Sequence, residues 1–217
     1  MSPFRSRCLV IFARDPIPGR VKTRLIPALG KDGAAAVYRQ MLQDTIATAA
    51  QAKATRHELW TDSRDGGPLL ARLAQRDGML IRTQCGGDIG LRMQNAFATT
   101  LGHSDAVVLI GTDCPEYDAA YLDEAFAALE QQDAVIGPAA DGGYALIGLR
   151  SLEPAVFEGI PWGSAQVLAA TRRRFARLHW NWLELPTLHD VDEYRDLLRF
   201  PRLGAIAKAA AQDRTHE

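Results

Sequence analysis

The chain has 217 residues, of which 47% are hydrophobic and 24% charged, a balance typical of a soluble globular protein rather than a disordered one. Its 25 lysines and arginines nearly cancel 26 aspartates and glutamates, which leaves a formal net charge of -1 at pH 7. This balance excludes a nucleic-acid binder that works through many phosphate contacts, but it allows a small anionic ligand held by a few local cations. The length predicts a single domain over residues 1–217.

Short apolar runs alternate with amphipathic patterns along the chain. Runs rich in β-branched residues predict strands at 8–13, 57–61, 79–81, 106–110, 134–136 and 144–149. Apolar residues at helical spacing predict helices at 31–52, 69–75, 87–101, 119–131, 165–178 and 192–200. This alternation predicts an α/β fold, a three-layer sandwich with a mainly parallel central sheet. Because ligands of such sheets bind beyond the carboxyl ends of the strands, function is expected in the loops there.

Neither the cysteines nor the apolar segments indicate a special compartment. The cysteines are Cys8, Cys85 and Cys114, and without a CxxC pair they predict no zinc ribbon or redox centre. Each is expected to be a buried filler, with Cys114 worth attention for its neighbours. No apolar segment approaches the roughly 20 residues that span a bilayer, and no signal-peptide pattern occurs. We therefore expect a cytoplasmic protein without a membrane partner.

The loop after the first predicted strand, residues 14–24, reads R-D-P-I-P-G-R-V-K-T-R. It carries four cations in a segment shaped by proline and glycine, namely Arg14, Arg20, Lys22 and Arg24. Rigid backbone and positive charge at the carboxyl end of a strand suit a pyrophosphate group. The spacing matches neither a Walker A loop nor a dinucleotide-binding fingerprint. The alternative is a solvated basic turn, and the position after the first strand favours polyanion binding.

A carboxylate follows the most apolar predicted strand, in the segment G-T-D-C-P at 111–115. Asp113 is poorly placed for stability there but well placed for a divalent cation. The alternative is that Asp113 caps the next helix, yet Asp118 lies closer to the start of that helix. We therefore favour a metal-binding role for Asp113.

Two later segments carry further carboxylates. The glycines of D-G-G-Y at 141–144 predict a hairpin turn or, equally, a close backbone approach to a substrate beside Asp141. In H-D-V-D at 189–192, Asp190 and Asp192 can converge on one cation if the segment is extended. Asp192 is alternatively the N-cap of the helix that follows.

The segment P-W-G-S at 161–164 predicts a shaped loop before a helix. Ser164 is a natural cap for that helix. Trp162 either stacks on a sugar or base, or packs against the protein.

The chain resembles one bacterial family through motifs in matching order: F-A-R-x-P-x-P-G-x-V-K-T-R-L, G-x-R-M, G-T-D-C-P, D-G-G-Y-x-L-I-G-L, P-W-G-S and D-V-D. This is the glycosyltransferase-like group, also labelled arsenosugar-biosynthesis or radical-SAM/selenodomain-associated transferases, and the resemblance runs from Phe12 to Asp192. More distantly the chain is similar to phospholactate and molybdopterin-cofactor guanylyltransferases. The resemblance implies the nucleotide-diphospho-sugar transferase (GT-A) fold.

The resemblance also implies roles for individual residues. The implied nucleotide-binding residues are Arg14, Pro18, Gly19, Lys22, Arg24, Gly90, Arg92 and Thr112. The implied ligands of Mg²⁺ or Mn²⁺ are Asp113, Asp190 and Asp192. Many glycosyltransferases have D-x-D where this chain has Thr112-Asp113-Cys114, so this loop supplies a single carboxylate. The implied substrate-binding residues are Gly142, Gly143, Tyr144 and Trp162. Asp141, as a base, and Lys22 are the implied catalytic residues.

The sequence thus predicts a metal-dependent transferase that uses an activated nucleotide. Glycosyl transfer from a nucleotide-diphospho-sugar to a small-molecule acceptor is favoured. The alternatives are nucleotidyl transfer from a nucleoside triphosphate with release of pyrophosphate, and a non-catalytic nucleotide-binding partner protein. The base, the sugar, the acceptor, the stereochemical course and the oligomeric state are left open.

Overall fold

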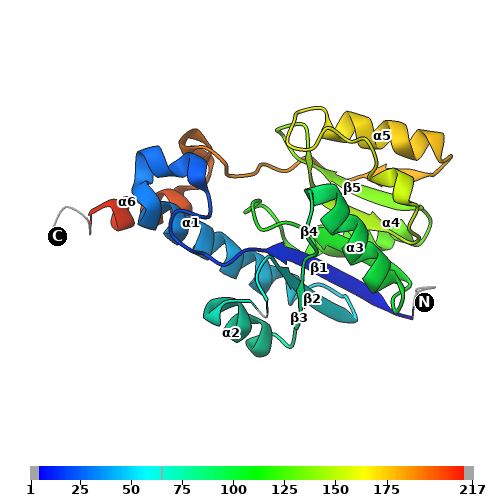
Figure 1. Cartoon of the computed structure of the whole chain (residues 1–217), viewed down its shortest axis with the longest axis horizontal. Helices are drawn as coiled ribbons and strands as arrows, with labels where there is room; N and C mark the ends of the chain where they lie inside the picture. Colours follow the sequence, from blue (N-terminus) through cyan, green and yellow to red (C-terminus); the bar gives the residue numbers. More distant parts are fainter. Residues whose placement is uncertain (1–4, 65, 213–217) are drawn as a thin grey trace.

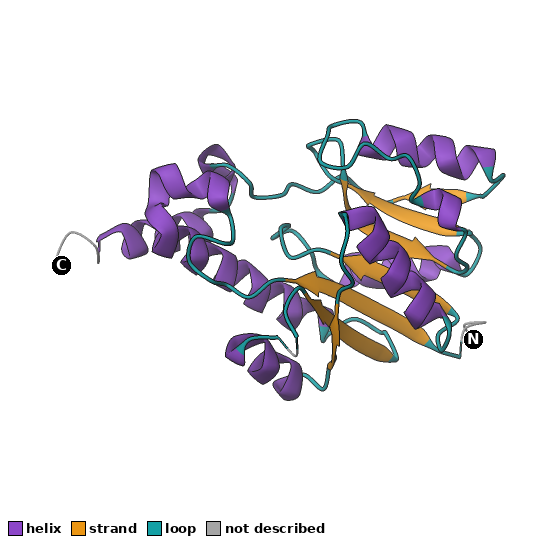
Figure 2. Cartoon of the chain, in the orientation of Figure 1, coloured by secondary structure: helices purple, strands orange, loops and turns teal. Residues whose placement is uncertain are grey.

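A computed structural model describes residues 5–64 and 66–212, and in this part of the chain seven strands form one sheet flanked by helices (Figures 1 and 2). The strands are β1 (Arg7–Ala13), β2 (Arg56–Thr61), β3 (Leu80–Thr83), β4 (Ala106–Ile110), β5 (Ala134–Pro138), β6 (Tyr144–Leu149) and β7 (Trp182–Glu184). Their order across the sheet is β3-β2-β1-β4-β6-β5-β7. The α/β class and the mainly parallel sheet are confirmed.

Strand β6 runs against the others. It pairs antiparallel with β4 and with β5, whereas the pairs β1–β2, β1–β4, β2–β3 and β5–β7 are parallel. The start of β6 therefore lies beside the carboxyl end of β4, where the Gly111 N–H donates to the Ala145 carbonyl. This reversal brings the 141–144 turn to the same sheet edge as the loops that follow β1 and β4.

Helices cover both faces of the sheet. The α-helices are α1 (Ile26–Ala49), α2 (Pro68–Arg76), α3 (Ile89–Leu101), α4 (Ala119–Leu129), α5 (Val167–Arg177) and α6 (Pro201–Gln212). The 3₁₀ helices are η1 (Thr23–Leu25), η2 (Pro154–Val156) and η3 (Tyr194–Arg199).

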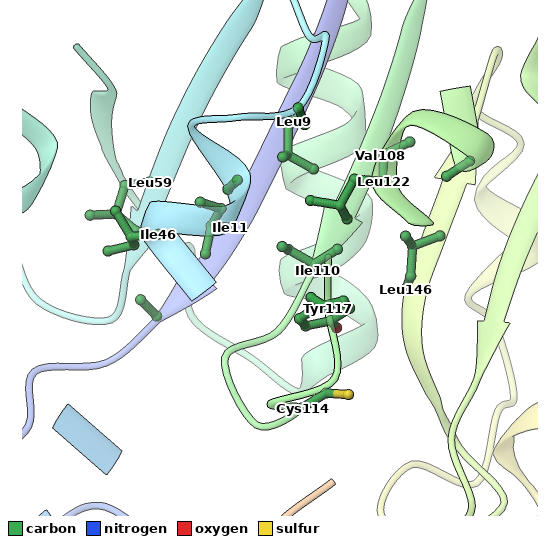
Figure 3. Packing of buried hydrophobic residues seen from close by; sticks show 14 of the residues in the cluster. Leu9, Ile11, Ile46, Leu59, Val108, Ile110, Cys114, Tyr117, Leu122 and Leu146 are labelled. Carbon is green, nitrogen blue, oxygen red and sulfur yellow. The ribbon is translucent and has the colours of Figure 1, made fainter. Parts of the chain in front are cut away.

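Alternation along the buried strands divides the core into two layers. Leu9 and Ile11 of β1 pack with Ile46 of α1 and Leu122 of α4 on one face (Figure 3). The intervening Val10 belongs to the opposite cluster, with residues of α3 and α5 that include Phe97 and Phe175. Because alternate side chains of a strand point to opposite faces, helices pack on both sides of the sheet. The predicted three-layer sandwich is therefore confirmed.

A third apolar cluster joins the first half of α1 to the C-terminal segment of the chain. Leu25 and Leu29 pack there with Leu197 of η3 and with Leu203 and Ala207 of α6, and Figure 1 shows α6 beside the first half of α1. The sequence analysis missed β7 and α6, and it predicted a longer helix at 192–200, where η3 is a short 3₁₀ segment. Among the described residues, no helix combines the length and hydropathy that crossing a membrane requires.

Candidate functional site

A cavity of about 670 Å³ opens at the sheet edge where β1 and β4 end and β6 begins. Its walls come from the loops after β1 and β4, the 141–144 turn, the 162–164 loop and the 190–192 segment. The loops singled out in the sequence therefore meet at one place, as the carboxyl-edge rule predicts.

Most of the predicted site residues line this cavity: Arg14, Lys22, Arg24, Arg92, Thr112, Asp113, Asp141, Gly143, Tyr144, Trp162, Asp190 and Asp192. Four others do not, namely Pro18, Gly19, Gly90 and Gly142. The structure places Gly19, at φ +83°, against the aliphatic stem of Lys31. The structure shows packing or turn geometry at these four residues, and their implied ligand contacts stay a prediction.

Lys22 lies between two carboxylates. Its Nζ is 2.7 Å from Asp113 Oδ1 and 2.9 Å from Asp192 Oδ1, and its side chain is only 5% exposed. The Lys22 backbone is left-handed, at φ 44°, a conformation that non-glycine residues adopt mainly at turns and functional sites. Although burial lowers the pKa of Lys22, the charges of Asp113 and Asp192 outweigh burial and raise it. We expected Lys22 to face phosphate, but here it pairs with the predicted metal ligands.

A backbone contact holds these two carboxylates together. The Val191 N–H donates to the Asp113 carbonyl at 2.9 Å, which fixes the 190–192 segment against the loop after β4. Asp192 is not the N-cap of η3, because Glu193 takes that position in a capping box with Asp196. The Asp192 carboxylate is therefore free to accept from Lys22 and, at 3.1 Å, from Arg24.

The carboxylates fit a divalent cation in part. In the described part of the chain, no three His, Cys, Asp or Glu side chains form a group that could hold a metal ion, so Asp113, Asp190 and Asp192 are not assembled as one ligand set. Asp113 and Asp192 alone converge on one cation, the ammonium of Lys22. Mg²⁺ is often held by one or two carboxylates together with substrate phosphates. Two convergent carboxylates fit such an ion.

Asp190 and Asp141 add negative charge beside this pair. Burial raises the pKa of Asp190, and the neighbouring charges of Asp141 and Asp192 raise it further. Asp141 also accepts from the Gly143 N–H at 2.8 Å, so the hairpin-turn interpretation is supported while the residue still lines the cavity.

A buried tyrosine links the loop after β1 to the loop after β4. The Tyr38 hydroxyl accepts from the Arg14 N–H at 2.9 Å and lies 3.0 Å from the Thr112 hydroxyl. Burial raises the pKa of Tyr38 to about 12, so the hydroxyl keeps its proton at neutral pH. The Thr112 hydroxyl thus has a hydrogen-bond partner within the protein. Tyr38 holds together two loops whose residues are far apart in sequence.

The sequence analysis gave no ligand-binding role to several other cavity residues, because a local pattern does not show which side chains face a cavity. They include Gln84, Ile89, Met93, Tyr117, Gly163 and Ser164. Ser164 donates to the Pro161 carbonyl and does not cap α5, whose N-cap is Gln166. Cys114 lines the cavity but is buried, and burial raises its pKa to about 12. At neutral pH Cys114 remains a thiol, as expected of a filler.

Two glycines allow close packing beside segments that line the cavity. Gly142, at φ +91°, would place a Cβ 2.3 Å from the Ala165 carbonyl oxygen, so the turn packs directly on the backbone before α5. Gly90 of α3 would place a Cβ 2.4 Å from Trp162 Nε1. Trp162 also packs edge-on against Tyr144, with ring centroids 6.4 Å apart. The Trp162 ring thus packs against the protein and lines the cavity at once.

Gly90→Ala is expected to destabilise the chain by about 1–3 kcal/mol, because the new methyl group must displace the Trp162 ring. In a Trp162→Ala background the same change should be neutral or stabilising, since alanine favours a helix over glycine by about 1 kcal/mol. Urea unfolding of the four chains measures this coupling. An equal penalty in both backgrounds would contradict the contact.

A second cavity of about 360 Å³ adjoins the first. The two share Arg24, Asp141, Asp190 and Asp192 as a common wall. The remaining lining of the smaller cavity is Ala140, His189, Glu193, Arg195, Asp196 and Arg199. The carboxylates therefore lie between two spaces of different size.

The chain belongs to the family described as uncharacterized protein conserved in bacteria (DUF2064), whose sequence profile matches residues 45–164. No curated protein sequence matches it. Among solved structures, it is similar to a protein from Desulfovibrio desulfuricans G20 that is provisionally named a nucleotide-diphospho-sugar transferase, with 33% identity, a TM-score of 0.84 and coverage of 95% of this chain and 97% of that one.

More distant structures share the fold. The 4-diphosphocytidyl-2C-methyl-D-erythritol synthase of Anaerococcus prevotii DSM 20548 has 14% identity and a TM-score of 0.60, over 95% of this chain and 96% of that one. The glucosyl-3-phosphoglycerate synthase of Mycobacterium tuberculosis, solved with Mn²⁺, UDP and glucosyl-3-phosphoglycerate, has 11% identity and a TM-score of 0.56, over 96% and 80%. The chain therefore has the nucleotide-diphospho-sugar transferase fold.

Proposed function

We propose that this member of the DUF2064 family is a metal-dependent glycosyltransferase that transfers a sugar from a nucleotide-diphospho-sugar to a small-molecule acceptor. The observation that carries the proposal is the convergence of Asp113 and Asp192 on one cation at the wall of the 670 Å³ cavity. A diphosphate that binds together with a divalent ion needs carboxylates to hold the ion and nearby cations to contact the phosphate oxygens. The 33%-identical relative, provisionally named a nucleotide-diphospho-sugar transferase, supports the same class.

The larger cavity is the proposed donor site. Arg14, Arg24 and Arg92 supply positive charge along its walls, and Tyr144 with Trp162 supplies an aromatic surface for the sugar or base. Arg14 and Arg24 keep 58% and 68% of their side chains exposed, so they are accessible to phosphate oxygens. Such charges stabilise a leaving diphosphate more in the transition state than in the ground state.

Asp113 and Asp192 are the proposed protein ligands of Mg²⁺ or Mn²⁺, with Asp190 close enough to add negative charge. The bound ion would neutralise charge that develops on the leaving nucleoside diphosphate. The Mn²⁺ found with UDP in the mycobacterial glucosyl-3-phosphoglycerate synthase supports a divalent ion on this fold.

Asp141 is the proposed base. It lines both cavities, so an acceptor in the smaller cavity can present a hydroxyl to Asp141 while the donor occupies the larger one. Asp141 then takes the hydroxyl proton as the acceptor oxygen attacks the sugar.

Nucleotidyl transfer is the second candidate, and the basic loop after β1 favours it. Exposed arginines in this loop suit a triphosphate, and cytidylyltransferase structures share the fold. The product would then be a nucleotide-linked acceptor and pyrophosphate. A non-catalytic nucleotide-binding partner protein is the third candidate, against which the convergent carboxylates argue.

Three finer expectations complete the proposal. We expect residues 1–217 to act as one transferase domain, and we expect the chain to work in the cytoplasm. We also expect the chain to be a member of the arsenosugar-biosynthesis and radical-SAM/selenodomain-associated transferases.

Thermal-shift measurements test the proposal with UDP, GDP, UDP-sugars, CTP and GTP, each with and without Mn²⁺. A ligand at about 100 times its Kd is expected to raise the melting temperature by roughly 5–10 °C. Ligands that shift are then incubated with the protein, and the products are separated. Nucleoside diphosphate release from a nucleotide sugar supports glycosyl transfer, whereas pyrophosphate release from a triphosphate supports nucleotidyl transfer. If no nucleotide shifts the melting temperature under any metal condition, the proposal fails.

A further inference from the structure

We propose that Lys22 and a divalent cation are alternative occupants of one position between Asp113 and Asp192, so that the free ion binds weakly until an anion draws Lys22 away. This inference rests on the metal use proposed above and adds the order in which the site fills. The chemical species that the site takes is then the metal complex of a diphosphate, not the bare ion.

The first argument is geometric. The Lys22 ammonium contacts one oxygen of Asp113 at 2.7 Å and one of Asp192 at 2.9 Å. A magnesium ion that bound both oxygens at about 2.0–2.1 Å would have to lie between the two carboxylates that the ammonium now bridges. The ammonium and the ion therefore exclude each other, by volume and by like charge.

The second argument concerns charge balance. Lys22 and Arg24 together carry two positive charges against the two negative charges of Asp113 and Asp192. A free divalent ion meets a pair of carboxylates whose own charges are already neutralised, with Asp141 and Asp190 as further negative charges beside the pair. A diphosphate in the larger cavity changes this balance, because it offers Lys22 other negative oxygens.

The third argument is that the Lys22 ammonium always needs an anionic partner, so it can move away from Asp113 and Asp192 only when another anion is present. Its side chain is almost fully buried, and a buried ammonium without an anion is strongly disfavoured. Lys22 lines the larger cavity, which is the proposed donor site. The lysine stem has four rotatable carbons, so the ammonium can exchange its carboxylate partners for the oxygens of a phosphate bound in that cavity.

Mn²⁺ titration in the absence of nucleotide, followed by the electron paramagnetic resonance signal of the free ion, tests the competition. Lys22→Met is expected to bind Mn²⁺ at least about tenfold more tightly than the unmodified chain, because the ion no longer displaces an ammonium. Arg24→Met is the matched control. It removes the other cation from Asp192 without vacating the position between the carboxylates, so its effect should be much smaller. Equal or weaker Mn²⁺ binding by Lys22→Met overturns the inference.

A second measurement needs no substitution, in case Lys22→Met does not fold. The chain has four lysines, Lys22, Lys31, Lys53 and Lys208, so side-chain ¹⁵N resonances can be assigned. The Lys22 ammonium signal is expected to move when Mg²⁺ and pyrophosphate are added together, and to stay in place with Mg²⁺ alone. A full shift with Mg²⁺ alone contradicts the inference. The Mn²⁺ titration contains no nucleotide, so its result can be separated from a failure of nucleotide binding in the thermal-shift test.

Discussion

Asp113→Asn is expected to lower transferase turnover by at least about 100-fold while the chain stays folded. Asp113 follows β4 with its side chain 57% exposed, so water can solvate the new amide. The change removes one of the two carboxylates that converge on a cation, and a neutral amide binds a divalent ion more weakly. The Mn²⁺-dependent part of the nucleotide thermal shift should disappear with the activity.

Asp32→Asn provides the matched control for Asp113→Asn. Asp32 is exposed on α1 and lines neither cavity, so the same chemical change there should leave the metal dependence intact. Circular dichroism of both variants establishes that they fold. If Asp113→Asn keeps the Mn²⁺-dependent shift of the original chain, the assignment of Asp113 as a metal ligand is wrong.

Glu58→Ala is expected to have the largest effect on stability, a loss of about 3 kcal/mol or more. The Glu58 side chain is 2% exposed, in the middle of β2. One carboxylate oxygen accepts from Trp60 Nε1 at 2.9 Å and from the Thr100 hydroxyl at 3.3 Å. The other lies 3.1 Å from His103 Nε2 and 3.8 Å from the Arg82 guanidinium. Alanine leaves buried donors without an acceptor and opens a cavity beside them.

Urea unfolding measures the cost of the Glu58 substitution, and Glu58→Gln serves as its conservative partner. The glutamine keeps one acceptor oxygen and nearly the same volume, so it should cost clearly less than alanine. Thr100→Val removes only the longer hydrogen bond and should cost about 1 kcal/mol. A Glu58→Ala chain within 1 kcal/mol of the original would show that the network contributes little. Glu58 lines neither cavity, so ligand affinity of the folded variants should not change.

Local sequence patterns predicted most of the elements. The strands at 106–110 and 144–149 match β4 and β6, and Asp118 caps α4 through the Tyr121 N–H as expected. The errors occur where long-range packing decides. Strand β7 is three residues long and depends on pairing with β5. The first turns of α1 begin before the predicted start and continue past Gly30, whose φ of 68° breaks the regular helix.

The candidate site was predicted in its composition but not in its contacts. The rule that ligands bind at the carboxyl ends of strands predicted that the cation-rich loop and Asp113 would lie at one sheet edge, and both line the same cavity as Asp141. Nothing local in the sequence indicates that Tyr38 joins two loops or that Gly90 accommodates Trp162. These contacts depend on how α1 and α3 lie against the sheet, and the apolar pattern of a helix is the same whether a residue faces core or cavity.

The sequence by itself determined a near-neutral α/β chain with cations after the first strand and carboxylates in later loops, because hydrophobic periodicity and turn chemistry are local properties. Only the tertiary structure decided how those charges pair. Lys22 and Asp192 are 170 positions apart, and they meet because the Val191 N–H donates to the Asp113 carbonyl and the C-terminal segment packs on α1. Electrostatic energy depends on distances in space, so the overall charge balance concealed an ammonium enclosed by the carboxylates proposed to hold a metal.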